Sequence, residues 1–375
     1  MTICIKHQQN LGIENAGRRS TNAAAMHLVA DECARCGSCV QECGFLQCHG
    51  TPGQIAEEHL SGSKEHFDTA FSCSLCHLCT QICPKRLPIA EMFLTIRRKA
   101  VLNGQGRYKE HRRILGYEKF GNSAPFTGYL LPVSCTTVFF PGCSLPGIRP
   151  EQTYQLFLLL QENIANLGIV FDCCNKPSHD LGFHKRFEKR FQPKLERLRS
   201  QGITKIITGC PSCFQIFQQY GKGLEVTTAY THLVGHIQQS DTACDTKFTI
   251  HDACTVRFEP EIQQAVRELV RARGIKISEM PHNREATLCC GEGGAASSDW
   301  KEKRLAEANG LPLLTFCAGC TMSLNSGTTS HLVDLLFEPP DTMLSPTKPI
   351  CSLFTYVNRL LLKRKIAKHL QKELL

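Results

Sequence analysis

Residues 203–213 read ITKIITGCPSC and residues 311–320 read LPLLTFCAGC. Each stretch is a short apolar run that leads into a Cys-x2-Cys pair. A run of this length, bounded by turn residues, is typical of a buried strand. Two such stretches in one chain indicate a repeated unit, and this repeat decides the fold.

The same landmarks surround both stretches. An apolar run leads into Cys143 in the first copy and into Cys254 in the second, an offset of 111 residues. Pro150 and Pro260 stand where helices are expected to begin, and a glycine follows each expected helix end. Strands that alternate with helices predict parallel βαβ units, whose sites form beyond the carboxyl ends of the strands. We expect the cysteines of both copies at that edge.

The predicted fold class is α+β overall, with a helical N-terminal domain followed by two repeated α/β domains with parallel strands. A helix is expected over Ile55–Phe71. The segments expected along the chain are a loose arm at 1–30, a cysteine-rich helical domain at 31–95, a basic linker at 96–134, the first repeat at 135–240, the second repeat at 241–340 and a basic amphipathic tail at 341–375.

Cysteine is the residue whose number stands out, with 23 among 375 residues. A chain of this length buries its own core and needs no disulfide staples, and we expect no secretory signal at its polar N-terminus. Soft thiolates at this density favour zinc, Cu(I) or iron–sulfur clusters. The hydrophobic content of 42% excludes wholesale disorder, and no apolar run is long enough to span a bilayer.

Two runs near the N-terminus share the spacing Cys-x2-Cys-x2-Cys-x3-Cys. This is the bacterial ferredoxin spacing, in which the fourth cysteine of each run ligates the cluster of the other run. A pair of zinc sites is the alternative, and four evenly spaced cysteines that occur twice disfavour it. We assign one cubane [4Fe-4S] cluster to Cys33, Cys36, Cys39 and Cys83, and a second to Cys73, Cys76, Cys79 and Cys43.

Each repeat carries five further cysteines, two of them adjacent in sequence. Neighbouring side chains diverge, which suits neither a disulfide nor a tetrahedral zinc site. A larger, irregular cluster that offers more than one iron fits this arrangement better. The two sets are Cys143, Cys173, Cys174, Cys210 and Cys213 in the first repeat, and Cys254, Cys289, Cys290, Cys317 and Cys320 in the second.

The repeat resembles the CCG domain of the heterodisulfide reductases, named for the Cys-Cys-Gly that stands here as Cys289-Cys290-Gly291. The two earlier runs resemble the double-cubane ferredoxin subunit of that family. Residues 31–335 therefore look like the fused form, in which one chain carries both parts, and all eighteen cysteines that the resemblance requires are present. Relatives include iron–sulfur subunits of anaerobic glycerol-3-phosphate, glycolate and lactate oxidoreductases.

The resemblance implies one non-cubane [4Fe-4S] cluster in each five-cysteine set, with a substrate disulfide cleaved between the two clusters. The expected function is an oxidoreductase subunit that passes electrons through the two cubanes to the two non-cubane clusters, which reduce a disulfide or oxidise thiols. All ten cysteines of the two sets are then catalytic. The alternative is a non-catalytic subunit that links a flavin dehydrogenase to a quinone or a cytochrome.

The first copy departs from the motif, because Asn175 stands where the second copy has Gly291. If this position requires a positive φ, asparagine is the least costly substitute for glycine. Residues 291–294 read GEGG and lack the ending of a phosphate loop. These glycines are expected to let the backbone approach the cluster and donate N–H groups to its sulfur.

Five cysteines belong to neither pattern and are expected to be small buried hydrophobes or idle thiols. They are Cys4, Cys48, Cys135, Cys244 and Cys351.

Three histidines are weaker candidates. His232 and His331 occupy equivalent places in the two copies, each followed by Leu-Val, and would serve as proton donors to product thiolates. His251, beside Asp252 and close to Cys254, is a similar candidate. Core or helix-start histidines with satisfied contacts are the alternative for all three.

The tail carries Leu362, Ile366, Leu370 and Leu374 at every fourth position among basic residues, which predicts an amphipathic helix. Such a helix lies on an anionic membrane, docks on a partner or packs on its own domain. The net charge of +9 is concentrated at 85–119 and in this tail, with too few aromatic residues to favour nucleic acid.

No flavin or nicotinamide fingerprint stands in the sequence, so neither cofactor is expected in this chain. We therefore expect a redox partner, either a flavoprotein, a ferredoxin-linked protein or a membrane cytochrome, and a small disulfide or thiol substrate. The expected location is the cytoplasm, with the inner face of the membrane reached through the partner.

Overall fold

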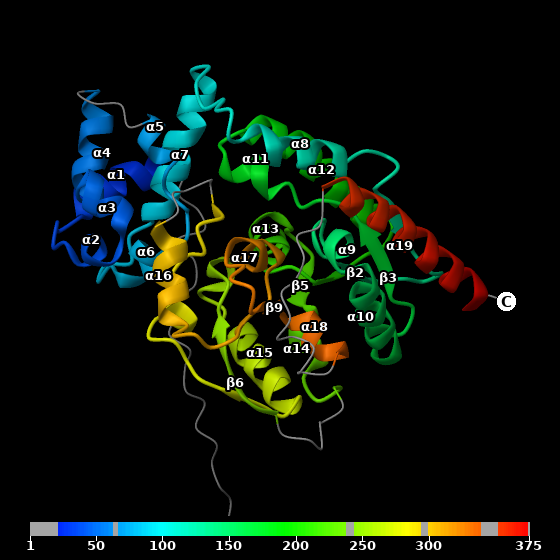
Figure 1. The fold of residues 1–375 in the computed structure, drawn as a ribbon. Coiled ribbons are helices and arrows are strands. Elements are labelled where there is room, and N and C mark those ends of the chain that lie inside the picture. Colours follow the sequence, from blue (N-terminus) through cyan, green and yellow to red (C-terminus); the bar gives the residue numbers. More distant parts are fainter. Residues whose placement is uncertain (1–21, 63–66, 238–243, 294–298, 339–351, 374–375) are drawn as a thin grey trace, which may run out of the picture.

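The computed structural model describes residues 22–62, 67–237, 244–293, 299–338 and 352–373. Helices form the N-terminal part, and two sheets with their own helices follow (Figure 1). This order confirms the predicted helical domain followed by two α/β units with parallel strands. Among the described residues, no helix is both long and apolar enough to cross a membrane.

The frame of the N-terminal part is α1 (Asn22–Glu32), which packs on α4 (Pro52–Ser61) and on α7 (Ile89–Leu102). Met26 and Val29 of α1 are buried in this core. Four short helices complete the part: α2 (Ser38–Glu42), α3 (Gly44–His49), α5 (Phe67–Ala70) and α6 (Leu78–Ile82).

Two expectations for this part require correction. Helix α1 begins inside the expected arm at 1–30, because its apolar side chains are needed by the core; residues 1–21 lie outside the described residues. The helix expected over Ile55–Phe71 is divided into α4 and α5. Helix α4 ends at Ser61, and Gly62, which follows it, has a φ of 69° that suits a helix C-terminus.

The first sheet has the strand order β1-β3-β2-β4-β5, with β1 antiparallel and the other strands parallel. Its strands are β1 (Gly128–Leu130), β2 (Thr137–Phe140), β3 (Gly168–Phe171), β4 (Lys205–Thr208) and β5 (Glu225–Thr228). Its helices are α9 (Leu145–Ile148), α10 (Pro150–Asn163), α11 (Lys176–Asp180), α12 (His184–Ser200), α13 (Pro211–Tyr220) and α14 (Ala229–Leu233).

The second sheet has the order β7-β6-β8-β9 with all strands parallel, which matches β3-β2-β4-β5 of the first. The repeat read from the sequence is thus confirmed in the topology. Its strands are β6 (Cys244–His251), β7 (Ile275–Ile277), β8 (Leu313–Thr315) and β9 (Thr329–His331). Its helices are α15 (Pro260–Ala272), α16 (Asp299–Glu307), α17 (Ala318–Ser323) and α18 (Leu332–Phe337), with short 3-10 turns η1 (Cys254–Val256) and η2 (Arg284–Ala286).

The segment 96–134, expected to be a linker, contributes structure to both sides. Helix α7 runs on to Leu102, and α8 (Arg112–Gly121) packs against α11. Strand β1 pairs with β3 and so belongs to the first sheet. The segment 96–134 therefore belongs to packed elements on both sides and does not form a separate linker.

The two α/β units share one apolar core. Leu156 and Phe157 of α10 belong to the same buried cluster as Val266 and Leu269 of α15. A buried ion pair also joins the units, with Arg149 Nε at 2.7 Å from a carboxylate oxygen of Asp334. The two units consequently hold their cysteines in one fixed arrangement.

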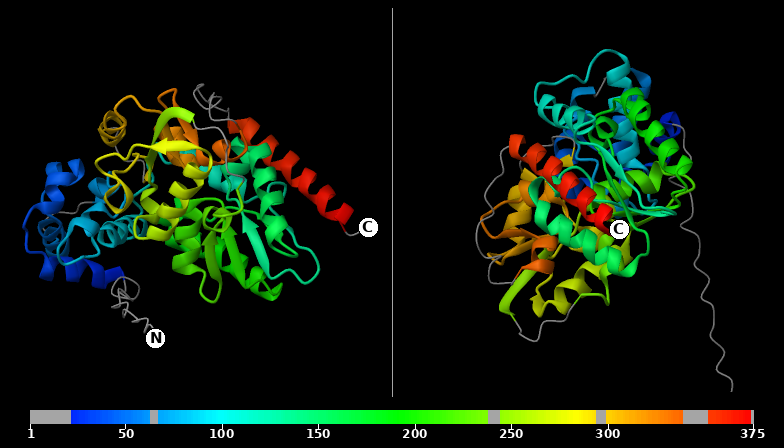
Figure 2. Two further views of the ribbon diagram at one scale, coloured as in Figure 1. Left: turned by 90° about the horizontal axis from the view of Figure 1, so that it is seen from below. Right: turned by 90° about the vertical axis from the view of Figure 1, so that its right-hand side faces the viewer.

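The C-terminal helix α19 (Ser352–Glu373) lies across α9 and α10 and also contacts β1 (Figure 2). Leu362 and Ile366 are buried in the shared core, and Leu370 packs against it. The predicted amphipathic helix is present, and these three residues of its apolar stripe pack on the chain's own domain. Leu374 lies outside the described residues.

Candidate metal centres

Equivalent loops carry the two N-terminal cysteine runs. Arg35 and Leu75 both have a φ of 51°, and Gly37 and His77 follow with φ of 79° and 60° just before α2 and α6. Positive φ values at residues other than glycine cost energy and are retained where the surrounding structure requires them. Each loop therefore turns at the same two points and brings the first three cysteines of its run together.

The first group of sulfurs crosses between the runs. Cys39 faces Cys33, Cys83 and Cys36, and burial followed by the charges of these thiols raises the pKa of Cys39 to about 11. Cys83, the fourth cysteine of the second run, thus lies with the first three cysteines of the first run. Cys36 is exposed, which places this group near the surface.

The second group contains the other four cysteines of the two runs: Cys73, Cys76, Cys79 and Cys43. Burial raises the pKa of Cys73 to about 12, with Cys76 and Cys43 acting in the same direction. Burial raises the pKa of Cys79 well above its ordinary value, and the same three thiols add to the effect. Thiols that repel one another when ionised are the ligands that a bound cation stabilises.

Arg97 supports the second run and was not anticipated from the sequence. Its fully buried guanidinium donates to the backbone oxygens of Ala70 at 2.9 Å, Phe71 at 3.2 Å and Cys73. It also donates to the backbone oxygen of Asp180 in the first α/β unit at 2.8 Å. No local pattern distinguishes a buried arginine from a solvated one, and Arg97 stands in a basic segment.

The five cysteines of the first repeat form a continuous chain of sulfur contacts at the carboxyl ends of β2, β3 and β4. The contacts run from Cys143 to Cys173, on to Cys174, then to Cys213 and finally to Cys210. The contact with Cys173, followed by burial, raises the pKa of Cys143 well above its ordinary value. The contact with Cys213 lowers the pKa of Cys210 to about 7.

The five cysteines of the second repeat form the same chain in the same order. The contacts run from Cys254 to Cys289, on to Cys290, then to Cys320 and finally to Cys317. Each member corresponds to its counterpart in the first set. The structure therefore brings together both five-cysteine sets that the sequence predicts.

The residue after each pair of adjacent cysteines has a positive φ, as expected if asparagine replaces glycine at this position in the first copy. Asn175 has a φ of 62° and Gly291 a φ of 86°. This confirms that the position needs the left-handed region, where asparagine replaces glycine at least cost. The backbone N–H of both residues points at a sulfur, at 3.5 Å for Cys173 and 3.3 Å for Cys289.

The second repeat is joined directly to the N-terminal part. Cys76 and Cys289 are in sulfur–sulfur hydrogen-bond contact, which raises the pKa of Cys76 well above its ordinary value. Arg257 donates to the backbone oxygen of Cys76 at 2.9 Å and to that of Thr287 at 2.7 Å. A Cβ atom at Gly293 would collide with the backbone oxygen of Ser74. The close approach at Gly293 is thus to the backbone of the second N-terminal run, and the expected approach of these glycines to a cluster stays a prediction.

Tyr230 links the two repeats at their Cys-x2-Cys loops. Its buried hydroxyl lies 3.1 Å from the backbone oxygen of Gly209 and 3.2 Å from that of Phe316, the residues just before Cys210 and Cys317. Helix α13, which begins after Cys210, also packs against η1 of the second repeat. One hydroxyl therefore contacts the backbone beside both five-cysteine sets.

Lys176 interacts with a cysteine of each set. Its ammonium is 2.8 Å from the carboxylate of Asp180 and 2.8 Å from Oε1 of Gln215. It also interacts with Cys254 of the second repeat and Cys174 of the first. Sequence reasoning assigned this lysine no role, since only the folded chain places it near both repeats.

The histidine pair inferred from the sequence is not equivalent in the structure. His331 ends β9 opposite Thr315, whereas the matching pair in the first sheet is Thr228 opposite Thr208. Nδ1 of His331 accepts the backbone N–H of Val333 at 3.2 Å and caps α18, and burial lowers its pKa well below the ordinary value. The counterpart of His331 is therefore Thr228, which caps α14 in the same way.

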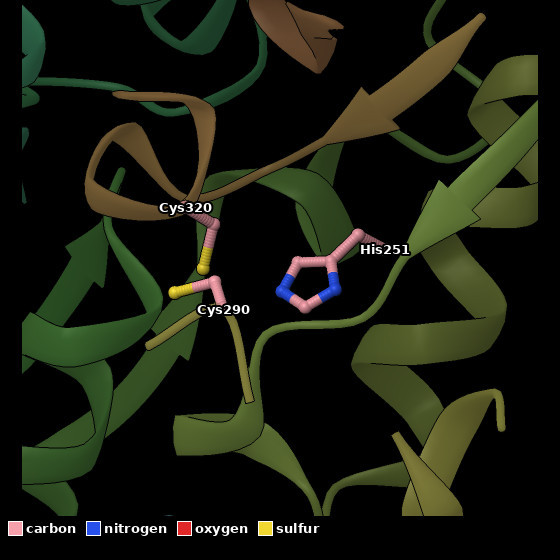
Figure 3. Close-up of side chains that lie close together, drawn as sticks. All are labelled: His251, Cys290 and Cys320. Atoms are coloured by element: carbon pink, nitrogen blue, oxygen red, sulfur yellow. The ribbon is translucent and has the colours of Figure 1, made fainter. Parts of the chain in front are cut away.

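His232 lies within α14, where burial lowers its pKa. His251 is different, because it is fully buried at the end of β6 with one ring nitrogen and the sulfurs of Cys290 and Cys320 within 4.8 Å of one another (Figure 3). Its neighbour Asp252 forms a buried two-point ion pair with Arg267, at 2.8 and 2.9 Å.

Of the five remaining cysteines, Cys48 is exposed and Cys135 is buried, with its thiol donating to the backbone oxygen of Thr137 at 3.2 Å. The side chain of Cys244, and Cys4 and Cys351 as a whole, lie outside the described residues.

The donor set fits iron–sulfur clusters. Every described cysteine is a free thiol. Thiolate groups of four in two interlocked runs suit cubane clusters, and N–H groups directed at sulfur are the contacts that tune such clusters. A further N–H group of this kind comes from Leu75, at 3.4 Å from the sulfur of Cys73.

Comparison with known families agrees with this division. Residues 29–87 match a 4Fe-4S dicluster domain, and residues 137–218 and 248–325 match two copies of a cysteine-rich domain, CCG.

The chain joins a 4Fe-4S dicluster domain to two CCG domains.

Several relatives are similar to this chain over most of its length. The dicluster and CCG domains together align with a CoB–CoM heterodisulfide reductase chain of Methanosarcina barkeri at 22% identity, over 84% of this chain and 94% of that protein. A fumarate reductase (CoM/CoB) chain of Methanothermobacter marburgensis is 23% identical over 78% of this chain and 67% of its own length. EtfAB:quinone oxidoreductase of Syntrophomonas wolfei is 22% identical over 65% of this chain and 38% of its own length.

These relatives are oxidoreductases or their subunits. The chain is an iron–sulfur electron-transfer protein related to the heterodisulfide reductases.

Proposed function

We propose that this protein is the disulfide-reducing subunit of a redox complex. In this proposal the dicluster domain holds two cubane clusters, and each five-cysteine set holds one non-cubane [4Fe-4S] cluster. The observation that carries it is the position of Lys176, whose ammonium interacts with Cys174 of one CCG domain and Cys254 of the other. A small disulfide bound beside Lys176 would lie close to a cysteine of each set.

The chemistry requires both electrons and protons. A disulfide takes up two electrons and two protons to give two thiols, and its sulfur–sulfur bond breaks. When bound, the clusters would supply electrons one at a time. The task of Lys176 in this scheme is to hold a positive charge beside the sulfur that becomes a thiolate, before a proton reaches it.

The path into the CCG domains follows from the contact between Cys76 and Cys289. Cys36 is exposed and belongs to the other N-terminal group, so a partner that docks there would deliver electrons at the outer end of the path. Arg257 and Gly293 hold the inner end together. We propose that this partner is a flavoprotein, a ferredoxin-linked protein or a membrane cytochrome, and that the complex works in the cytoplasm or at the inner face of the membrane.

A second candidate function is electron transfer without substrate chemistry, from a flavin dehydrogenase to a quinone or a cytochrome. The similarity to EtfAB:quinone oxidoreductase favours it. In that case the two CCG domains would lie on a path to an acceptor protein, and small disulfides would not react.

The experiment uses the full chain, purified without oxygen, reduced with dithionite and freed of excess reductant. Glutathione disulfide or a water-soluble naphthoquinone is then added, and reoxidation is followed by absorbance. We expect the disulfide to reoxidise the protein, and Lys176→Met to slow that step by about a hundredfold.

Lys205→Met is the matched control. Lys205 forms an ion pair with Glu225 in the same CCG domain, but at the amino ends of the strands, away from the cysteines. This variant should keep the wild-type rate. Reoxidation of the wild type by the quinone alone would replace the disulfide proposal with the electron-transfer alternative.

A further inference from the structure

His251 carries a polar atom that the rest of the protein does not satisfy. Its imidazole is fully buried, and its Nε2 has no hydrogen-bond partner among the described residues. An unpaired buried polar group destabilises a protein, so a position that retains one points to an unseen partner. Figure 3 shows this ring nitrogen directed toward the sulfurs of Cys290 and Cys320.

The other ring nitrogen fixes where the proton lies. Nδ1 of His251 is 2.9 Å from Nε of Arg304, and a guanidinium can only donate. Nδ1 must therefore accept, which leaves the proton of the neutral ring on Nε2. The same contact excludes a doubly protonated ring, in which two N–H groups would face each other.

Arg304 is itself held in place. It is fully buried on α16, donates to a carboxylate oxygen of Glu307 at 2.7 Å and donates to the backbone oxygen of His282 at 2.5 Å. Glu307 also contacts His282. Rotation of Arg304 away from His251 would break these contacts, so the tautomer of the histidine is set by the fold.

A nitrogen that carries a proton cannot ligate iron, and it is well placed to donate. We propose that His251 is an N–H donor to the sulfur of the second non-cubane cluster, held as the Nε2–H tautomer by Arg304, and that it raises the reduction potential of that cluster without ligating it. Hydrogen bonds to sulfur raise cluster potentials because they stabilise the more negative, reduced state. This inference rests on the proposed clusters and goes beyond them by assigning a positioning residue.

The first CCG domain has no histidine at the equivalent position. Phe140 occupies the position equivalent to His251, three residues before the first cysteine of its set, and it is fully buried at the end of β2. The two five-cysteine sets therefore match in their sulfur contacts and differ in this one neighbour. Phe140 is therefore a natural control: a buried side chain at the equivalent position that has no N–H group to donate.

The test compares His251→Leu with His251→Gln in the full chain, purified without oxygen. Leucine removes both nitrogens, whereas the glutamine amide restores an N–H group near the place of Nε2. Iron and sulfide are measured, and a redox titration followed by electron paramagnetic resonance gives the potential of the second cluster. The signal of that cluster is identified as the one lost in Cys290→Ala.

We expect His251→Leu to keep the wild-type iron content and to shift the equilibrium of this cluster at least tenfold toward the oxidised state, about 59 mV for a one-electron couple. His251→Gln should recover most of this shift, and Phe140→Leu should leave the potential of the second cluster unchanged.

Loss of about four irons in His251→Leu would overturn the inference in favour of ligation. An unchanged potential, or an equal shift in both His251 variants, would overturn it in favour of a packing role. Wild-type protein that holds iron in the dicluster domain alone would refute the proposed clusters and the inference with them. The iron content of the wild-type protein therefore shows whether the proposed clusters are wrong or only the role of His251 is wrong.

Discussion

Cys76 of the dicluster domain and Cys289 of the second CCG domain are in sulfur–sulfur contact. The corresponding cysteine of the first CCG domain, Cys173, has its sulfur contacts with Cys143 and Cys174 of its own set. The two CCG domains therefore differ in how they meet the N-terminal part: the second contacts it through a cluster cysteine, whereas the first contacts it through Arg97, which donates to the backbone oxygen of Asp180 at 2.8 Å.

The proposed clusters predict a metal content. We expect about sixteen irons per chain, four in each of four [4Fe-4S] clusters, and a brown, oxygen-labile protein. Iron and acid-labile sulfide in protein purified without oxygen give the number. A value near eight would mean that the five-cysteine sets hold no cluster.

The sequence predicted features that depend on residues close together in the chain, and it missed features that depend on contacts between distant residues. The spacing of Cys33 to Cys43 and of Cys73 to Cys83 identified local loops, and the repeated strand–cysteine pattern predicted the two sheets, because such signals lie within a few residues. Arg257 and Tyr230 were missed, since their partners lie far away in sequence. The pairing of His232 with His331 was wrong because a shared Leu-Val motif was taken for equivalence, whereas strand register pairs His331 with Thr228.

Arg257 should hold the contact between the dicluster domain and the second CCG domain. Arg257→Met leaves the backbone oxygens of Cys76 and Thr287 without their donor, at a cost of about 1–3 kcal/mol for each unsatisfied group. Hydrogen–deuterium exchange should become faster in peptides around both residues. Arg273→Met is the control, because Arg273 donates to the backbone oxygens of Leu335 and Glu338 within the second CCG domain. Equal exchange near Cys76 in the two variants would show that Arg257 does not hold the contact.

Tyr230 should hold the two Cys-x2-Cys loops in register. We expect Tyr230→Phe to retain its iron but to lose about 1–3 kcal/mol of stability, because two buried carbonyl groups lose their shared donor. Its disulfide-dependent reoxidation should be slower than that of the wild type. Tyr129→Phe removes a hydroxyl that donates to Asp172 within the first CCG domain alone, and it should reoxidise at the wild-type rate. The same rate in both variants would rule out the bridging role of Tyr230.

Helix α19 should stabilise the CCG domains through its buried face. Leu362 is 3% exposed and its neighbour Leu361 is 55% exposed, so the two leucines form a matched pair. Leu362→Ala should lower the free energy of unfolding by about 2–5 kcal/mol, as expected when a buried leucine is truncated. Leu361→Ala should change it by less than about 0.5 kcal/mol. Anaerobic urea unfolding measures both, and similar losses would mean that the helix is not packed as described.

The most direct test of the proposed disulfide chemistry is the reoxidation of dithionite-reduced protein by glutathione disulfide in Cys174→Ala, Cys290→Ala and the double variant. If the disulfide is cleaved between the two five-cysteine sets, each single change should abolish reoxidation almost completely while the dicluster domain still accepts electrons. The double variant should be scarcely slower than either single one, because groups that act as a unit are not additive. Retention of the wild-type rate in either single variant would contradict the proposal.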